Sequence, residues 1–241
     1  MLQTGSVLIT RRSLLLAAAV TTVAACSSRR DLSGPPVNPA SPIDANPLDA
    51  SGARSKPNPD VDKVPASIAL IGDSIAAQSE VALDAVLTGI GFASVTINAE
   101  PSRRIEIGGR KPVSGLDIVT FVEGADPPEM WVIALGTNDA GLYSTDEEYQ
   151  GLIDSLLQVI GDDVPLVWVN AYREDHLDGC VQFNNLLRES LDDRGNATVA
   201  DWYLQCVAPA SDILTDGVHP NDRGILVFAD TVRAAIATRL S

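Results

Sequence analysis

Histidine and cysteine are scarce in this sequence. The 241 residues include two histidines, His176 and His219, and three cysteines. Metal centres are built from clusters of histidine, cysteine and carboxylate ligands, and two isolated histidines provide no such cluster. We therefore expect neither a metal ion nor another cofactor, and chemistry carried out by side chains alone.

Basic residues are also few. The chain has 17 Lys and Arg against 32 Asp and Glu, which gives a formal net charge of −15. Because so acidic a surface repels the phosphates of DNA and RNA, we expect no nucleic-acid partner. The same charge opposes docking on anionic lipid, and a covalent anchor is the route to a membrane that we expect.

No apolar run is long enough for a permanent membrane span, but residues 1–25 have the layout of an export signal. They contain no acidic residue, an Arg pair at 11–12 and a short apolar run at 14–20. The Arg pair resembles the twin-arginine export signal. Val-Ala-Ala-Cys at 23–26 resembles the bacterial lipobox, which predicts a lipid anchor on Cys26 at the outer face of the cell membrane. The alternative is an ordinary signal peptide whose cysteine is incidental.

Cleavage after residue 25 leaves 15 basic and 32 acidic residues, a formal charge of −17. The stretch 26–64 that follows the signal is rich in Pro, Ser, Asn and Asp, with almost no large apolar side chain. Such a composition buries too little surface to offset its ordering entropy, and it predicts a disordered tether. Residues 65–241 are long enough for one folded domain. Its two cysteines, Cys180 and Cys206, either pair in a disulfide, which we expect for an exported chain, or remain buried thiols.

Strand and helix patterns alternate through residues 65–241. Alternation of this kind predicts a three-layer α/β/α sandwich around a mostly parallel five-stranded sheet. A helix over 144–160 has capping-box spacing between Ser144 and Glu147. The expected strands are 67–71, 94–98, 130–135, 166–169 and 198–202. The other expected helices are 75–87, 116–122, one marked by apolar residues at helical spacing over 180–191, and one beginning near 221.

Three polar motifs follow predicted strands: Gly-Asp-Ser at 72–74, Gly-Thr-Asn-Asp at 136–139 and Asp-Gly-Val-His-Pro at 216–220. Because carboxyl ends of parallel strands meet at one edge of a sheet, these motifs are expected to converge. A serine hydroxyl becomes a nucleophile when an imidazole accepts its proton and a carboxylate fixes the imidazole. Alone, Gly-Asp-Ser could simply cap a helix. His176 lies in a charged loop and is interpreted as a solvated histidine.

In order and spacing these motifs resemble the first, third and fifth blocks of the SGNH (GDSL-type) hydrolase family, over essentially all of residues 65–241. The resemblance implies a flavodoxin-like SGNH hydrolase fold. It makes Ser74 the nucleophile, His219 the general base and acid, and Asp216 the carboxylate that orients it. The Ser74 backbone N–H and the Asn138 side chain would be oxyanion donors.

The second block departs from the family pattern. The family usually has a glycine after the second strand, and here the position is filled by Ser102, with Gly108 or Gly109 as substitutes. A backbone N–H does not depend on the side chain, so serine serves if the turn permits its conformation. Alternatively, Ser102 caps a turn and Arg103 is solvated. The Ser-Arg pair, with Asp-Trp at 201–202, is similar to the extracellular domain of peptidoglycan O-acetyltransferases.

These features predict a serine esterase or deacylase of the cell envelope, acting on short O-acyl esters of a glycan or a small alcohol. One alternative is an O-acyltransferase that uses the same residues with a sugar hydroxyl as acceptor. It would need a separate membrane protein as acyl donor, because the chain has no multi-span domain. A second alternative is a lipoprotein that binds glycan without turnover.

Overall fold

The computed structural model describes residues 63–209 and 211–241. The predicted signal over 1–25, the lipidation site Cys26 and the predicted tether over 26–64, apart from its last two residues, lie outside the described residues. Within the described part of the chain, no helix has both the length and the apolar character needed to cross a bilayer.

The centre of the domain is a five-stranded sheet of order β2-β1-β3-β4-β5, in which every pairing is parallel. Its strands are β1 (Ser67–Gly72), β2 (Ser94–Ala99), β3 (Trp131–Ala134), β4 (Leu166–Val169) and β5 (Ala197–Ala200). From β1 the chain forms β2 on one side of the first strand and β3 on the other. Open α/β folds of this order bind ligands beyond the carboxyl ends of the strands that flank such a reversal.

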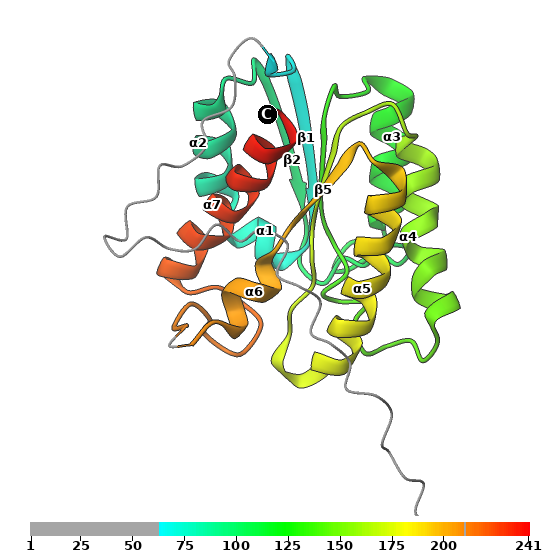
Figure 1. Cartoon of the computed structure of the whole chain (residues 1–241), viewed down its shortest axis with the longest axis vertical. Coiled ribbons are helices and arrows are strands. Elements are labelled where there is room, and N and C mark those ends of the chain that lie inside the picture. Colours follow the sequence, from blue (N-terminus) through cyan, green and yellow to red (C-terminus); the bar gives the residue numbers. More distant parts are fainter. Residues whose placement is uncertain (1–62, 210) are drawn as a thin grey trace, which may run out of the picture. The chain divides into compact units, whose positions relative to one another are not determined.

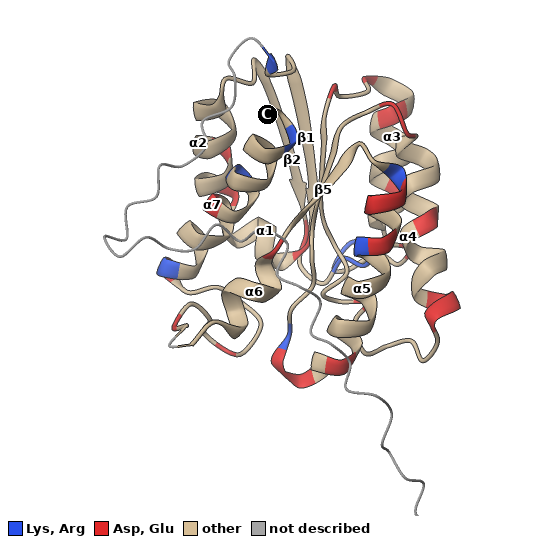
Figure 2. Cartoon of the chain, viewed as in Figure 1, with Lys and Arg blue, Asp and Glu red and all other residues tan. Residues whose placement is uncertain are grey.

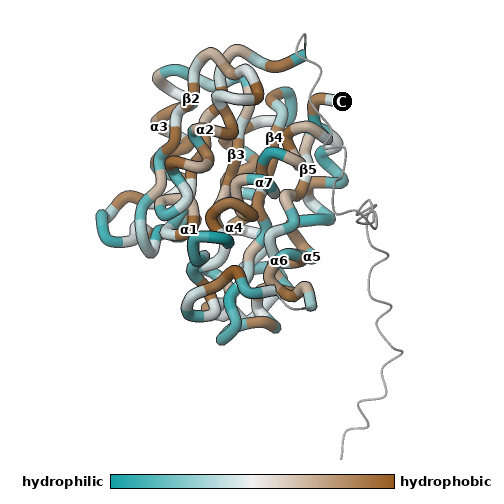
Figure 3. The backbone as a smooth tube through the Cα atoms, turned by 90° about the vertical axis from the view of Figure 1, so that its left-hand side faces the viewer, coloured by the Kyte–Doolittle hydropathy of each residue, from teal (hydrophilic) through white to brown (hydrophobic). Residues whose placement is uncertain are grey.

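The two faces of the sheet bury separate cores. Along β1, Ile68 and Leu70 belong to one buried cluster, and Ala69 and Ile71 belong to the other. This alternation follows from the two-residue period of a strand. Hydrophobic residues run along the strands, while many hydrophilic residues occupy the loops near α1 and α6 (Figure 3).

Helices cover both faces (Figure 1). One layer holds α1 (Ser74–Gln78), α2 (Glu80–Ile90), α6 (Trp202–Val207) and α7 (Asp222–Arg239). The other layer holds α3 (Gly115–Ala125), α4 (Asp146–Ile160) and α5 (Leu177–Arg194), which follows the short 3₁₀ turn η2 (Glu174–His176). Acidic residues occur on helices of both layers (Figure 2). The three-layer α/β/α sandwich predicted from the sequence is confirmed.

Several predicted boundaries differ from the structure. The helix expected over 75–87 is two helices, α1 and α2, separated at Ser79, whose N–H donates to the carbonyl oxygens of Ile75 and Ala76. The last strand stops at Ala200, because the side chain of Asp201 caps a further helix, α6, that the pattern did not indicate.

The capping box of α4 lies one residue later than the sequence spacing suggests. Thr145 is the N-cap, and its side chain accepts from the backbone N–H of Glu148. The Glu148 carboxylate in turn accepts from the backbone N–H groups of Thr145 and Ser144. Ser144 and Glu147 have the same spacing and compatible side chains, so the sequence alone could not select the register.

The expected disulfide is not formed, since Cys180 and Cys206 are both free and buried. Cys180 belongs to the core on the α5 side of the sheet, and Cys206 belongs to the core on the α7 side. The two thiols thus lie in separate hydrophobic clusters. Burial raises the pKa of Cys180 to about 11 and raises that of Cys206 further. They are the buried thiols of the alternative prediction.

Candidate active site

Ser74 stands at the turn from β1 into α1. A Cβ at Gly72 would lie 2.4 Å from the Cβ of Ala76, so only glycine lets the strand turn this tightly into the helix. The buried Asp73 caps the helix, and its Oδ1 accepts from the backbone N–H of Ile75 at 2.9 Å. As the first residue of α1, Ser74 has a backbone N–H without an intrahelical acceptor.

The structure brings Ser74, His219 and Asp216 together as the sequence predicts. The Ser74 Oγ lies 3.0 Å from His219 Nε2, and His219 Nδ1 lies 2.9 Å from Asp216 Oδ2. An ionised carboxylate can only accept, so Nδ1 carries the proton and Nε2 is left to accept the serine hydroxyl proton. This is the arrangement that makes a serine nucleophilic.

Asp216 is held ionised by the loop that follows it. Its Oδ1 accepts from the backbone N–H groups of His219 at 2.8 Å and Val218 at 3.1 Å. The hydrogen bonds from the backbone and the ring of His219 lower the pKa of Asp216 to about 2. The carboxylate is therefore ionised at neutral pH.

A neighbouring loop supports the triad loop. The N–H of Glu174 donates to the carbonyl oxygen of Gly217 at 3.0 Å. Gly217 has φ +82°, and a Cβ there would lie 2.5 Å from Oε2 of Glu174. Glu174 is far from Asp216 in sequence and carries no motif, so the sequence did not reveal this contact.

Ser102 takes the place that glycine usually fills. Its φ is +62°, and it is the one non-glycine residue with positive φ among residues 63–209 and 211–241. The N–H of Arg103 donates to the carbonyl oxygen of Glu100, which closes a turn with Pro101 and Ser102 at its centre. The N–H of Glu100 donates to the carbonyl oxygen of Gly72. This hydrogen bond places the turn of Ser102 beside the residues that lead into Ser74.

The alternative positions Gly108 and Gly109 pack against other backbone. A Cβ on Gly109 would lie 2.3 Å from the carbonyl oxygen of Pro101, and one on Gly108 would lie 2.4 Å from the backbone nitrogen of Val113. Ser102, which is exposed in the turn, is thus the residue of this loop with a glycine-like conformation at the predicted position.

Asn138, after β3, lies between these two turns. Its Nδ2 donates to Asp73 Oδ2 and to the carbonyl oxygen of Arg103, each at 3.2 Å. Both distances are at the long end of the N–H···O range. The predicted role as an oxyanion donor requires one of these two hydrogens to turn to the substrate. That role stays a prediction.

Comparison with known protein families matches residues 70–225 to the GDSL-like lipase/acylhydrolase family. The chain belongs to this family. The resemblance to SGNH hydrolases predicted from the three motifs is confirmed.

Solved structures share the fold. The C-terminal catalytic domain of peptidoglycan O-acetyltransferase A from Streptococcus pneumoniae is 24% identical with a TM-score of 0.55, over 73% of this chain and 93% of that one. TesA is 16% identical with a TM-score of 0.59, over 72% and 99%. The esterase EstA from a Pseudoalteromonas species is 13% identical with a TM-score of 0.55, over 72% and 97%. A search of curated proteins gave no match.

In this member of the GDSL-like family, Arg103 is buried beneath the turn that carries Ser74 rather than solvated. Its Nη1 donates to the carbonyl oxygens of Gly72 at 3.1 Å and Asn98 at 2.7 Å, and its Nη2 donates to Asn98 Oδ1 at 2.9 Å. Burial lowers the pKa of Arg103. The Ser-Arg pair was noted in the sequence, but only the fold shows that the guanidinium ties β1 to β2.

Two buried carboxylates flank Asn138. Burial raises the pKa of Asp73 to about 6 and that of Asp139 to about 7. Asp139 Oδ2 accepts from the backbone N–H of Ile105 at 3.2 Å, and its Oδ1 has no partner among the residues described. Asp139 therefore ties the loop of Ser102 to the end of β3.

His176 is separate from the triad. Its ring packs against Gly141, where a Cβ would lie 2.3 Å from Nδ1, and its Nε2 lies 3.7 Å from Asp175. It is half-buried rather than fully solvated. Within the part of the chain that the structure describes, no group of three or more His, Cys, Asp or Glu could hold a metal ion.

Proposed function

We propose that the protein is a serine esterase that hydrolyses short O-acyl esters through an acyl-enzyme on Ser74. The continuous hydrogen-bonded chain from Ser74 through His219 to Asp216, with links of 3.0 and 2.9 Å, carries this proposal. Membership in an acylhydrolase family supports it.

The reaction has two halves. His219 Nε2 takes the hydroxyl proton while Ser74 Oγ attacks the ester carbonyl carbon. The N–H groups of Ser74 and Ser102 and the amide of Asn138 stabilise the oxyanion. His219 then gives the proton to the departing alkoxide oxygen, and the alcohol leaves an acylated serine. Water, deprotonated by the same imidazole, attacks this second ester and releases the acid.

The solvent exposure of His219, the proposed general base, favours hydrolysis over acyl transfer. The side chains of His219 and Asp216 are 33% and 55% exposed, so water can reach the imidazole that must activate it. An acyltransferase has to limit this access, because water competes with its acceptor alcohol.

The cell envelope is the proposed place of action. The twin arginines and the Val-Ala-Ala-Cys sequence before the domain support export and lipid anchoring at Cys26. An O-acylated envelope glycan is the natural ester within reach of a tethered enzyme at that surface.

The test compares the purified protein with its Ser74→Ala variant on 4-nitrophenyl esters of acetate, butyrate and octanoate. We expect turnover by the parent alone, fastest on acetate. Mass spectrometry of the parent, quenched during turnover, should show an acyl adduct on Ser74. Equal rates for both proteins would contradict serine catalysis. A rate that rises when an acceptor sugar is added to the assay would instead indicate transfer.

A further inference from the structure

The loop over residues 100–111, which contains the turn of the predicted oxyanion donor, is basic in a protein that is acidic overall. It has four Lys and Arg against two Asp and Glu, whereas the whole chain has 17 against 32. Some of these positive charges are used inside the protein. Arg103 is bonded to β1 and β2, and Lys111 forms an ion pair with Glu100 at 3.1 Å. Arg104 is not used in this way.

Arg104 lies beside the amide of Asn138. That amide donates to the carbonyl oxygen of Arg103 at 3.2 Å, and the carbonyl belongs to the peptide that joins Arg103 to Arg104. The geometry of a peptide therefore places the Arg104 Cα within about 6 Å of Asn138 Nδ2. On the other side of Arg104, the N–H of Ile105 donates to the buried Asp139. Contacts of the residues before and after Arg104 thus fix it next to Asn138.

The guanidinium of Arg104 is available to a ligand. Its side chain forms no hydrogen bond or ion pair among residues 63–209 and 211–241, and it is partly exposed. Burial raises the pKa of Asp139 and of Tyr143, and the charge of Arg104 opposes both rises. The guanidinium therefore lies close to the segment that follows β3, to which Asn138 also belongs.

A group of the substrate would come within reach of this guanidinium. The predicted oxyanion lies against the Asn138 amide, and both the acyl group and the departing oxygen are bonded to the same carbon as the oxyanion. A guanidinium presents parallel N–H donors that match the two oxygens of a carboxylate. One arginine, with the carboxylate of Glu106 also near Asp139 and Tyr143, suits one negative charge better than the two of a phosphate.

We infer that Arg104 determines specificity by selecting esters that carry a carboxylate close to the ester bond. The carboxylate belongs either to the acyl group, as in a half-ester of a dicarboxylic acid, or to the alcohol, as in an acylated hydroxy acid. The acidic surface elsewhere repels such a substrate, so its acceptance depends on this local positive charge. The inference rests on the proposed function and adds a charge requirement to its substrate.

The experiment uses two pairs of esters, and the members of each pair differ by one negative charge. 4-Acetoxybenzoate and its methyl ester place the charge on the alcohol, and monoethyl and diethyl succinate place it on the acyl group. The value of kcat/KM is measured for the parent, Arg104→Gln and Arg104→Lys, by phenol absorbance for the first pair and by proton release for the second. Comparing the charged-to-neutral ratio between proteins removes the intrinsic reactivity of each ester.

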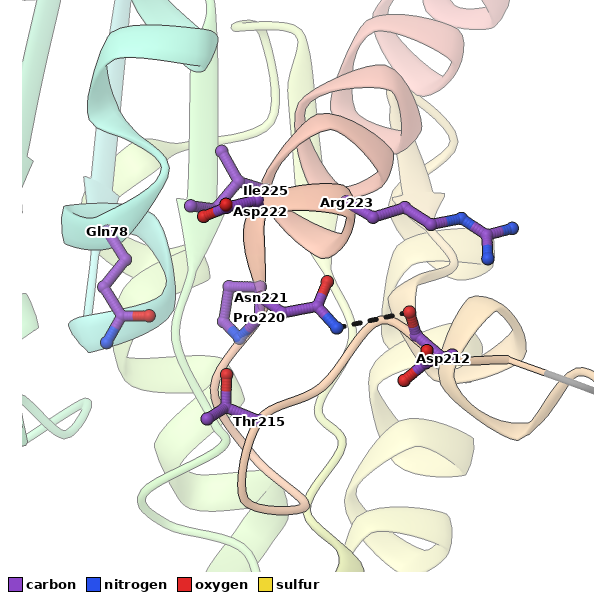
Figure 4. Close-up of a pocket in the computed structure, with 8 residues that line it drawn as sticks. All are labelled: Gln78, Asp212, Thr215, Pro220, Asn221, Asp222, Arg223 and Ile225. Carbon is purple, nitrogen blue, oxygen red and sulfur yellow. Dashed lines mark hydrogen bonds between the residues drawn. The ribbon is translucent and has the colours of Figure 1, made fainter.

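Arg223→Gln is the matched control. Arg223 is exposed on the first turn of α7, and its side chain extends away from Gln78 on α1 (Figure 4). Like Arg104, it forms no hydrogen bond or ion pair in the part of the chain that the structure describes. Its replacement therefore removes one positive charge from the protein without changing the loop over 100–111.

We expect Arg104→Gln to lower kcat/KM by at least about tenfold on the charged ester of one or both pairs, and by less than about threefold on the neutral esters, because a hydrogen bond to a charged group is lost. The affected pair identifies the half of the ester that carries the carboxylate. Arg104→Lys should keep part of the selectivity, because it keeps the charge and loses the planar fork. Arg223→Gln should match the parent.

Active-site titration with a serine-directed phosphonate corrects each rate for misfolded protein. Three outcomes would overturn the inference: an equal loss on charged and neutral esters, no loss on any ester, or the same selective loss in Arg223→Gln. An equal loss would show that Arg104 supports the reaction itself and does not read the charge of the substrate.

Binding separates this inference from the proposed reaction. 4-Acetoxybenzoate and monoethyl succinate are titrated calorimetrically into the Ser74→Ala variant, with and without Arg104→Gln. Binding that Arg104→Gln weakens supports the carboxylate site even if the parent turns over no ester. Absence of binding of both at millimolar concentration would overturn the carboxylate site, and the esterase would stand if the parent hydrolyses 4-nitrophenyl acetate.

Discussion

The amide of Asn138 donates to the buried carboxylate of Asp73, with 3.2 Å between Nδ2 and Oδ2. Asp73 immediately precedes Ser74, the predicted nucleophile, and Asn138 follows the neighbouring strand β3. The contact therefore ties the predicted oxyanion donor to the turn that presents Ser74.

Replacement of Asn138 tests its assignment as an oxyanion donor. We expect Asn138→Ala to lower kcat on 4-nitrophenyl acetate by about 10²–10³, the usual loss for one such donor, with KM little changed. The reason is that the amide would stabilise charge that exists only in the transition state. Steady-state kinetics measures kcat and KM separately. A normal kcat would remove Asn138 from the oxyanion hole.

We expect that lysine cannot replace Arg103 without loss of stability and activity. Arg103→Lys leaves at least one of its three acceptors, the buried Gly72 carbonyl and two part-buried oxygens of Asn98, without a donor, because an ammonium group cannot reproduce the guanidinium fork. We expect a loss of about 2–3 kcal/mol in the free energy of unfolding, measured in urea, and a lower kcat.

The exposed Arg110 lies on the same loop and provides the control for Arg103. Arg110→Lys should change neither the unfolding midpoint nor kcat. If Arg103→Lys and Arg110→Lys behave alike, the buried contacts of Arg103 contribute nothing to the site.

The positive φ of Ser102 predicts which residues can replace it. Ser102→Gly should keep kcat near the parental value, because glycine accepts this conformation and retains the backbone N–H. Ser102→Val should lower kcat by at least about tenfold, because a β-branched residue strains the turn and displaces the N–H donor. Active-site titration with a serine-directed phosphonate would correct for misfolded protein. A fully active valine variant would exclude this N–H from the mechanism.

Burial of Asp139 should make stability depend on pH. Its folded pKa of about 7 lies above the usual unfolded value, so the folded protein binds a proton that the unfolded chain releases. Between pH 4 and 7 the free energy of unfolding should fall by up to about 1.4 kcal/mol for each pH unit, relative to Asp139→Asn. Denaturant unfolding of both proteins at pH 4, 5, 6, 7 and 8 measures this. Parallel curves would show that Asp139 is ionised throughout.

Local pattern was enough for much of the fold. The apolar runs through β1, β3 and β4 are continuous because these strands are buried on both faces, which makes them easy to find. Boundaries that depend on single caps were harder. Ser144 and Thr145 are both good N-caps, and only the packed position of α4 selects Thr145. The break at Ser79 likewise has no breaker residue to mark it.

The sequence by itself determined the fold class and predicted that Ser74, Asp216 and His219 lie together, because a parallel sheet brings the carboxyl ends of its strands to one edge, and the motifs follow strands. The tertiary structure decided what distant residues do to one another. It buried Arg103 against Gly72, raised the pKa of Asp139 by desolvation, and placed Cys180 and Cys206 in different cores. Burial and long-range contacts depend on how the layers pack, and the spacing of residues along the chain does not encode that packing.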